Sequence, residues 1–209
     1  MKGTEIIDDL FEKYLALETC RNDIIGAIDE ITSCYSNKGK LLLCGNGGSC
    51  ADADHIVGEL MKSFEKKRPI NPKLEKSLNA TERGKYIGRK LQNALPAISL
   101  NAHSALYSAI SNDIDPNLVF AQQIVGYGNP GDVLIAISTS GNSQNVVDAA
   151  ITAKAMGLKV IGLTGESGGK IKELCDITIR VPALSIPEIQ EFHLPVYHTI
   201  CKYIENKFF

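Results

Sequence analysis

The feature that most constrains this chain is an apolar run that ends in a glycine-rich turn. Leu41-Leu42-Leu43-Cys44 reads as a buried strand, and Gly45-Asn46-Gly47-Gly48-Ser49 follows it directly. The glycines let the backbone turn sharply and let a ligand approach bare amide groups. Because a helix is expected from about Ser49, its first unpaired N–H groups would attract an anion. The turn therefore predicts an anion-binding connection between a strand and a helix.

The helix that follows this turn carries His55 and Glu59, which lie four residues apart and so share one face. A dinucleotide fingerprint would need a third glycine where Cys50 stands, which makes that interpretation weak. A phosphate loop of the nucleoside-triphosphatase type would need Gly-Lys-Ser/Thr, and the sequence lacks it. Taken alone, the stretch also fits an ordinary strand-to-helix turn whose His55 and Glu59 are solvated.

A second turn, rich in hydroxyl groups, favours the anion-binding interpretation. It follows the apolar run Val133–Ile137 and reads Ser138-Thr139-Ser140-Gly141-Asn142-Ser143, with a helix expected from about Gln144. Hydroxyls and unpaired backbone N–H groups together suit a phosphate dianion without any lysine. Helix capping explains one serine of this turn but not the others. We therefore expect phosphate binding here, with Ser49 as a further contributor.

The composition is that of an ordinary globular protein and excludes several partner classes. The 209 residues suit one domain, and the net charge of −2 gives no reason to expect nucleic acid or an anionic membrane. We find no apolar run near the ~20 residues of a membrane span, and no signal peptide at the start. The six cysteines form no CxxC pair, so we expect free thiols and a cytoplasmic location.

Strand-like and helix-like segments alternate along most of the chain. Alternation of this kind predicts an α/β fold with a parallel sheet and right-handed crossovers, in which ligands bind beyond the carboxyl ends of the strands. Both turns sit at such ends, so we expect them to face one site. Strands are expected at 40–44, 97–100, 133–137, 159–163 and 177–181, and helices at 49–64, 104–113, 117–125, 144–156 and 187–204, with a short one ending at 174.

Two segments stand outside this rhythm. Residues 4–36 have helical periodicity, and the polar stretch at 21–23 could divide them into two helices. Their apolar faces suggest packing against another subunit, although packing on their own sheet explains them too. Residues 70–95 are rich in Lys, Glu and Arg, with a helix expected over 81–95, and we interpret them as an inserted arm or lid.

The last helix contributes more polar groups that could reach the site. Gln190 and His198 lie eight residues apart, close to one face, and His193 lies between them. With His55 and Glu59 they could enclose a divalent metal, since imidazole and carboxylate suit zinc among other metals. A glutamine ligand is unusual for zinc, and a single histidine is more often structural than a ligand. The residues alone therefore give only a weak indication of metal.

Together, the glycine turn with His55 and Glu59, the serine turn, and Ile189-Gln190-Glu191-x-His193 with His198 resemble the sedoheptulose-7-phosphate isomerase (phosphoheptose isomerase) family. That family belongs to the sugar isomerase (SIS) domain proteins. The resemblance covers nearly the whole chain apart from residues 70–95. It implies a single SIS domain over 1–209, with a five-stranded parallel sheet flanked by helices (flavodoxin-like or Rossmann-like). It also implies a homotetramer with active sites at subunit contacts.

The resemblance also assigns roles to residues of this chain. It implies one zinc ion per site, no nucleotide, and a phosphorylated sugar as substrate. The implied zinc ligands are His55, Glu59, Gln190 and His198; the implied phosphate and substrate contacts are Asn46, Gly47, Gly48, Ser49, Asp113, Ser138, Thr139, Ser140, Ser143 and Gln190.

This chain departs from the family at three places. Ser63 stands where an arginine is usual, Pro187 and Glu188 replace an Asp-Arg pair, and residues 70–95 lengthen a connection by roughly two dozen residues. The changes leave the chemistry intact and bear on the identity of the sugar.

The function implied is aldose–ketose isomerisation, most simply of sedoheptulose 7-phosphate to D-glycero-D-manno-heptose 7-phosphate through an enediol with metal assistance. Such a reaction needs a base and an acid, and Glu59 and His198 suit these catalytic roles. Two alternatives stay open. One is a non-catalytic SIS-domain protein that binds a sugar phosphate or regulates a partner, and the other is an isomerase for another sugar phosphate.

Overall fold

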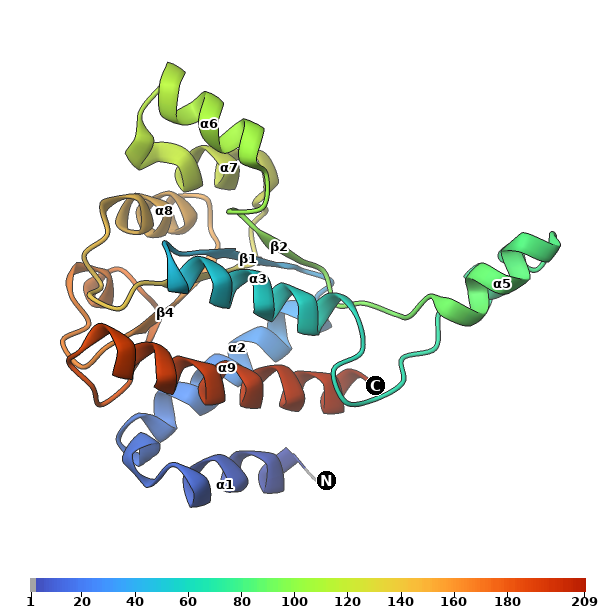
Figure 1. Ribbon diagram of the computed structural model, residues 1–209, viewed down its shortest axis with the longest axis horizontal. Helices are drawn as coiled ribbons and strands as arrows, with labels where there is room; N and C mark the ends of the chain where they lie inside the picture. Colours follow the sequence, from blue (N-terminus) through green and yellow to red (C-terminus); the bar gives the residue numbers. More distant parts are fainter. Residues whose placement is uncertain (1–2) are drawn as a thin grey trace.

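Five short parallel strands form the centre of the computed structural model, which describes residues 3–209 (Figure 1). They lie in the order β2-β1-β3-β4-β5, and each neighbouring pair is parallel. The predicted sheet is confirmed, and each strand agrees with its expected position within one residue. Their bounds are β1 Leu41–Cys44, β2 Ala97–Ser99, β3 Val133–Ile137, β4 Lys159–Thr164 and β5 Ile177–Arg180.

The strand order places a switch point between β1 and β3. From β1 the chain moves outward to β2 on one side, whereas from β3 it moves outward to β4 and β5 on the other. Leu43 of β1 pairs with both Ser99 of β2 and Ile135 of β3, so the strand ends are level. Ligands in open parallel sheets bind at the carboxyl ends of the strands beside such a switch point. The glycine turn follows β1 and the serine turn follows β3, so both lie at this point.

Helices cover both faces of the sheet. Side chains alternate along a strand, so successive residues pack into the two cores on opposite faces. Leu41 and Leu43 face one core, whereas Leu42 and Cys44 face the other. The first core contains residues of α1 Gly3–Lys13, α2 Arg21–Ser36, α3 Gly48–Met61 and α9 Ile186–Phe208; the second contains residues of α6 Ser104–Asp113, α7 Val119–Tyr127 and α8 Gln144–Ala155.

The N-terminal helices are present, but the break between them lies earlier than predicted. Tyr14 leaves the helical conformation, and a 3-10 helix, η1 Leu15–Cys20, separates α1 from α2. Arg21 pairs with Glu18 and Asp8, so the polar stretch begins α2 instead of interrupting a helix. The apolar faces of α1 and α2 are buried within the chain itself.

Helix α3 ends at Met61, three residues before the predicted end, for a reason that lies far away in the sequence. A longer helix would bond the carbonyls of Glu59 and Leu60 to the N–H groups of residues 63 and 64. The guanidinium of Arg68 takes both carbonyls instead, at 2.9 and 2.6 Å. The N–H of Phe64 donates to the carboxylate of Glu205 at 2.8 Å. Contacts between distant residues therefore end the helix, and periodicity could not show them.

The segment from about residue 70 to 95 is an arm that extends away from the body, as the inserted-arm interpretation expects (Figure 1). It contains two helices, α4 Pro72–Leu78 and α5 Glu82–Lys90, which pack on each other. Asn71 caps α4 by accepting from the N–H of Lys73, and Thr81 caps α5 by accepting from that of Gly84. The prediction missed α4 and extended α5 five residues too far, to position 95.

Helix α9 is the longest element and runs beside α3 in the same direction (Figure 1). It continues to Phe208, four residues beyond the prediction, because Ile204 and Glu205 are still buried against the body. Neither α9 nor any other helix within residues 3–209 is long and apolar enough to cross a membrane. Two further 3-10 helices, η2 Pro116–Leu118 and η3 Lys170–Glu173, complete the described chain.

Candidate functional site

The glycine and serine turns are joined by a pair of amide side chains. Asn46 Nδ2 donates to Asn145 Oδ1 at 2.9 Å, and Asn145 Nδ2 donates back to Asn46 Oδ1 at 3.0 Å. Asn46 was predicted as a substrate contact, whereas Asn145 was missed, since a lone Asn in the first turn of a helix gives no signal in the sequence. The reciprocal bond therefore holds the glycine turn beside the first turn of α8, which directly follows the serine turn.

A second asparagine fixes the start of the glycine turn. Asn101, which follows β2, donates from Nδ2 to the carbonyl of Gly45 at 2.7 Å. Its Oδ1 accepts from the N–H of Gly45 at 3.3 Å. Ser49 is almost fully buried in the first turn of α3. The turn therefore has a fixed shape at the switch point, with the N-terminus of α3 directed into the site.

The serine turn is held from within and from the next loop. Ser138 Oγ donates to Ser143 Oγ at 3.2 Å, and Ser140 Oγ accepts from the N–H of Asn142 at 3.1 Å. Gly141 has φ of 66°, and a Cβ there would lie 2.0 Å from the carbonyl oxygen of Gly168. The loop after β4 therefore packs directly on the serine turn, and no larger side chain fits at position 141.

A cavity opens beside the serine turn. It has a volume of about 180 Å³ and is lined by Thr139, Ser140, Asn142, Glu166, Leu184 and Ile186, among others. The backbone of Thr139 is tied to Gly165, whose N–H donates to its carbonyl at 3.0 Å. The predicted residues Thr139 and Ser140 therefore border open space, as phosphate contacts must.

Gln190 lies over the glycine turn, at the start of α3. A Cβ at Gly48 would come within 2.3 Å of Gln190 Nε2, so the amide rests directly on the glycine backbone. Eight residues separate Gln190 from His198, which is about 12 Å along a helix. The structure therefore places the Gln190 amide beside Gly48, one of the predicted substrate contacts.

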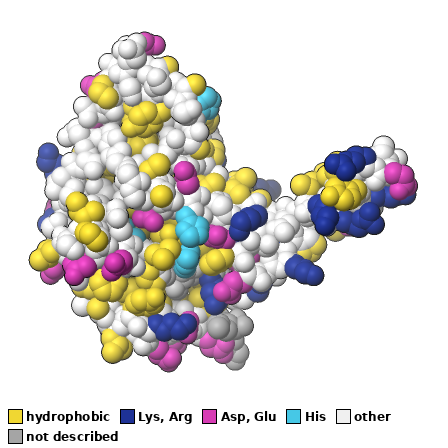
Figure 2. All heavy atoms as spheres, viewed as in Figure 1, with side chains coloured by type: hydrophobic (Ala, Val, Ile, Leu, Met, Phe, Trp, Pro, Cys, Tyr) yellow, Lys and Arg dark blue, Asp and Glu magenta, His cyan; other side chains and the backbone are white. Residues whose placement is uncertain are grey.

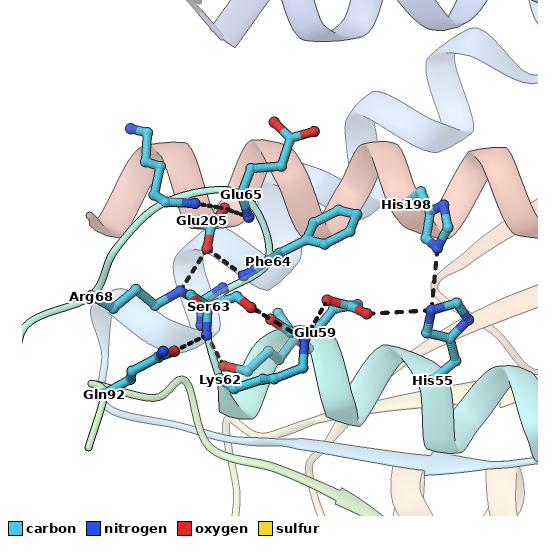
Figure 3. Close-up of polar contacts among 12 residues, drawn as sticks. His55, Glu59, Lys62, Ser63, Phe64, Glu65, Arg68, Gln92, His198 and Glu205 are labelled. Atoms are coloured by element: carbon cyan, nitrogen blue, oxygen red, sulfur yellow. Dashed lines mark hydrogen bonds and ion pairs between the residues drawn. The ribbon is translucent and has the colours of Figure 1, made fainter. Parts of the chain in front are cut away.

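The remaining three predicted ligands meet where α3 and α9 run side by side (Figure 3). His55 Nε2 lies 3.3 Å from Glu59 Oε1 and 3.5 Å from His198 Nε2. On the space-filling surface, histidine side chains are visible between these two helices (Figure 2). Burial lowers the pKa of His198, His55 lowers it further, and Glu59 raises it.

These three side chains fit zinc in their chemistry and partly in their spacing. Two ligands of a tetrahedral zinc with bonds of about 2.0–2.1 Å lie about 3.4 Å apart, which matches both measured distances. Glu59 and His198 approach the His55 nitrogen from different directions, and Figure 3 draws no contact between Glu59 and His198 themselves. Accordingly, within residues 3–209 no three His, Cys, Asp or Glu side chains form a ready metal site.

Two residues that the sequence analysis missed lie behind His55. The hydroxyl of Tyr197 is 2.9 Å from His55 Nδ1, and the carboxylate of Asp52 is a second polar group that interacts with this hydroxyl. Burial raises the pKa of Asp52, and the bond from Tyr197 and the charge of His55 lower it in part. Burial and the neighbouring Asp52 also raise the pKa of Tyr197. The periodicity of α9 marks Tyr197 only as a core position.

Glu59 is fixed from its own end of α3 as well. Lys62 Nζ lies 3.1 Å from Glu59 Oε2. Beyond it, Arg68 pairs with Glu205 at 2.8 Å, and both side chains are almost completely buried (Figure 3). Burial alone would raise the pKa of Glu205. The N–H groups of Phe64, Glu65 and Lys66 and the Arg68 guanidinium outweigh that effect and hold its pKa below the usual range.

Two other singled-out residues lie away from this cluster. Asp113 ends α6, which packs on η2 and α7, and its carboxylate accepts a bond from the neighbouring Asn112. Within this chain the structure therefore does not bring Asp113 to the glycine turn. His193 lies on the buried face of α9 and is completely buried, and burial lowers its pKa to about 4. It belongs to the core and not to the site.

Comparison with known proteins gives the chain a clear set of relatives. The model of the SIS domain family matches residues 7–93 and 87–165. The chain is 44% identical to the phosphoheptose isomerase of a Nitratiruptor species over 172 residues, which is 82% of this chain and 79% of that protein. It is 37% identical to the phosphoheptose isomerase of Rhodospirillum rubrum, over 92% of this chain and 90% of that protein.

Solved structures agree with this relationship. A phosphoheptose isomerase from Francisella tularensis superposes with a TM-score of 0.76 at 31% identity, covering 99% of this chain and 100% of the other. Phosphoheptose isomerase GmhA from Neisseria gonorrhoeae superposes with a TM-score of 0.73 at 32% identity, covering 98% and 94%. The relatives match over nearly the full length, so the site lies inside the shared part of the chain.

Proposed function

The chain belongs to the SIS-domain phosphoheptose isomerases, and we propose that it interconverts sedoheptulose 7-phosphate and D-glycero-D-manno-heptose 7-phosphate. The observation that carries the proposal is the path of α3. This helix begins at the glycine turn, beside the serine turn, and further along it carries His55, which contacts both Glu59 and His198 of α9. One element thus joins an anion-binding end to a cluster of proton-transfer groups.

The length of that path favours a long substrate. Glu59 follows Ser49 by ten residues, which is about 15 Å along the helix axis. Helical side chains lean back toward the N-terminus, so the functional groups lie somewhat closer together. A seven-carbon sugar with its phosphate at one end and its carbonyl at the other suits such a separation better than a short sugar does.

The phosphate is proposed to bind at the two turns. Ser49, Ser138, Thr139, Ser140 and Ser143 supply hydroxyls, and the N-termini of α3 and α8 favour negative charge there. Gln190 and Asn46 border the same end of the site and are proposed to hold the sugar hydroxyls.

The proton transfers are assigned to Glu59 and His198. Isomerisation moves a proton between adjacent carbons, which needs a base at carbon and an acid at the carbonyl oxygen. Glu59, an acceptor, is proposed as the base. The lowered pKa of His198 makes its protonated form a stronger acid, and it is proposed to serve the oxygen. Zinc, if held by His55, Glu59 and His198, would polarise the substrate carbonyl as a Lewis acid. Because a group bound to zinc cannot transfer a proton at the same time, Glu59 and His198 would have to leave the ion to act as base and acid.

The test is direct conversion. The protein is incubated with sedoheptulose 7-phosphate and with a panel of shorter ketose phosphates, and aldose formation is followed by NMR. We expect sedoheptulose 7-phosphate to react fastest. Conversion of a different sugar alone would reassign the substrate, and no conversion of any sugar would favour a non-catalytic sugar-phosphate-binding protein.

We also propose a cytoplasmic homotetramer. Several large apolar side chains are exposed in the single chain, notably Leu15 and Leu184, at 79% and 78%, and Ile186. Such exposure supports contact with other copies. All six cysteines lie within the described residues and are free thiols, which supports a reducing compartment. Light scattering should give about four times the chain mass of 22.6 kDa; a monomer at micromolar concentration would contradict the assembly.

The arm is proposed to contact a neighbouring copy in that assembly. It leaves from the far end of α3 and extends away from the two turns, so it does not cover the site of its own chain (Figure 1). Residues 70–95 carry six Lys or Arg and two Glu, whereas the whole chain carries 22 Lys or Arg against 24 Asp or Glu. A basic arm on an otherwise acidic chain supports a contact between copies.

A further inference from the structure

The side of His55 that faces away from Glu59 and His198 carries a short hydrogen-bonded chain. His55 Nδ1 lies 2.9 Å from the hydroxyl of Tyr197, and the carboxylate of Asp52 is a second polar group that interacts with that hydroxyl. Asp52 and His55 are in α3, and Tyr197 is in α9, so the chain bridges the two helices of the site. Asp52 Oδ2 is buried without a hydrogen-bond partner among the described residues. The side chains that act on the Asp52 carboxylate are Tyr197 and His55.

The direction of these two bonds follows from counting protons. A tyrosine hydroxyl has one proton to donate, and an ionised carboxylate can only accept. Tyr197 therefore donates to Asp52, and its oxygen is left to accept from His55. Neutral imidazole carries its proton on one nitrogen, so a proton on Nδ1 leaves Nε2 with a free lone pair.

That lone pair points at the cluster. Glu59 Oε1 and His198 Nε2 lie 3.3 and 3.5 Å from His55 Nε2. With its proton on Nε2, neutral His55 would simply donate to Glu59. With its proton on Nδ1, Nε2 and the carboxylate oxygen are both acceptors, and a cation between them relieves their repulsion.

We propose that Tyr197, fixed by Asp52, is a positioning residue that sets the tautomer of His55 and presents its Nε2 lone pair to the metal. The proposal deepens the zinc assignment made above and rests on it for the identity of the cation. Partners of this kind orient metal-bound histidines, and their loss typically lowers metal affinity by about 10- to 100-fold. The tautomer itself can be read without any metal.

The first experiment uses nitrogen-15 NMR of the metal-free protein at pH 8. We expect His55 in the Nδ1-protonated form. Asp52→Ala should release the Tyr197 proton to donate to His55 Nδ1, which moves the ring proton to Nε2. Tyr197→Phe removes the acceptor and should shift the ring the same way. Tyr127→Phe, on the opposite face of the sheet, should leave it unchanged.

The second experiment measures zinc affinity by competition with a chelator. Asp52→Ala and Tyr197→Phe should each weaken zinc binding by about 10- to 100-fold, with Tyr127→Phe unchanged. The positioning role of Tyr197 would be overturned if His55 of the wild type carried its proton on Nε2, or if neither variant changed the His55 tautomer. If the wild type binds no zinc, the metal assignment fails by itself. The tautomer measurement then still decides whether Tyr197 and Asp52 set the tautomer of His55.

Discussion

The α3–α9 pair and the α4–α5 pair are both built from amphipathic helices, yet only the first has a surface to bury against. In α3 and α9, residues such as Ile56, Leu60 and Val196 are almost fully buried. Helix α4 buries no residue, and α5 buries only Gly84. Leu74, Tyr86 and Leu91 of the arm are each between 44% and 48% exposed.

This difference separates what the chain folds for itself from what it presents outward. Helices of seven and nine residues are marginal alone, and most helical stability in proteins comes from packing. The site sits on the packed pair, where side chains can be held to fractions of an ångström. The arm has helix caps and charged side chains but no apolar core of its own. Its order therefore depends on its neck, where the chain near Arg68 and Asn93 joins the arm to the body, and on any surface that packs against it. Arg68 and Glu205 form the boundary between the two regions.

The largest effect is expected at that boundary. Arg68→Ala should lower the free energy of unfolding by about 3–5 kcal/mol, because it leaves the Glu205 carboxylate buried without its partner. It also frees the last carbonyls of α3. Urea unfolding measures the change. Arg83→Ala is the matched control in the arm, where the guanidinium stacks on exposed Tyr86, and it should change stability by less than about 0.5 kcal/mol. If the two variants lowered the free energy of unfolding equally, the proposed difference between the packed helix pair and the arm would be wrong.

A smaller effect is expected for phosphate recognition by the packed region. Hydrogen bonds to a charged group contribute about 1.5–3 kcal/mol each, so Ser140→Ala should raise KM by roughly ten- to a hundredfold. Steady-state kinetics with the phosphorylated substrate measures this. Ser77→Ala, at an exposed position in α4, is the control and should leave KM unchanged. An unchanged KM in Ser140→Ala would remove the serine turn from the phosphate site.

The pH dependence of stability should come in part from His193, on the buried face of α9. Its folded pKa of about 4 lies below the unfolded value of 6.5, so the unfolded state takes up the proton first. The stabilisation is complete above pH 6.5 and is lost as the pH falls toward 4, by roughly 2 kcal/mol between pH 6.5 and 5. Unfolding of wild type and His193→Gln across this range tests it. Parallel curves for wild type and His193→Gln would contradict the assignment.

The smallest effect on stability is expected from removing the arm. The N–H of Asn93 donates to the carbonyl of Arg68 at 2.7 Å, so the two sides of the neck already touch and a short glycine linker can replace residues 71–91. Because so little of the arm is buried, the thermal midpoint should fall by only a few degrees. Light scattering and activity of the same variant test the proposed contact between copies. Full activity and full assembly would show that the arm has no role in either.

Much of the difference between the packed body and the arm could be predicted from the sequence, because the patterns of neighbouring residues were distinct. Apolar runs such as Val133–Ile137 predicted the strands, and glycine and serine turns marked their carboxyl ends. The end of α3 could not be predicted, since Arg68 and Glu205 act across 137 residues of sequence. In the arm, Asn71 and Pro72 were adequate helix-start signals for α4, and the charged composition concealed them.

For the site, residue types predicted the chemistry, and only the fold could show which residues meet. His55, Glu59 and His198 converge as expected, because α3 and α9 run in parallel. Gln190 shares their helix face but lies about 12 Å away along it, over Gly48. Asn145 and Tyr197 carry no motif of their own, so their roles follow from partners on other elements.

The central claim is that catalysis resides in the packed α3–α9 pair, and the most direct test is the turnover of two variants. Glu59→Gln and His198→Asn should each lower kcat for sedoheptulose 7-phosphate by at least about 100-fold, since general acid–base groups contribute about 10²–10⁴. Both should still bind inorganic phosphate at the serine turn, and Glu75→Gln in the arm should turn over normally. If Glu59→Gln and His198→Asn both keep wild-type kcat, the proposed isomerase mechanism is wrong.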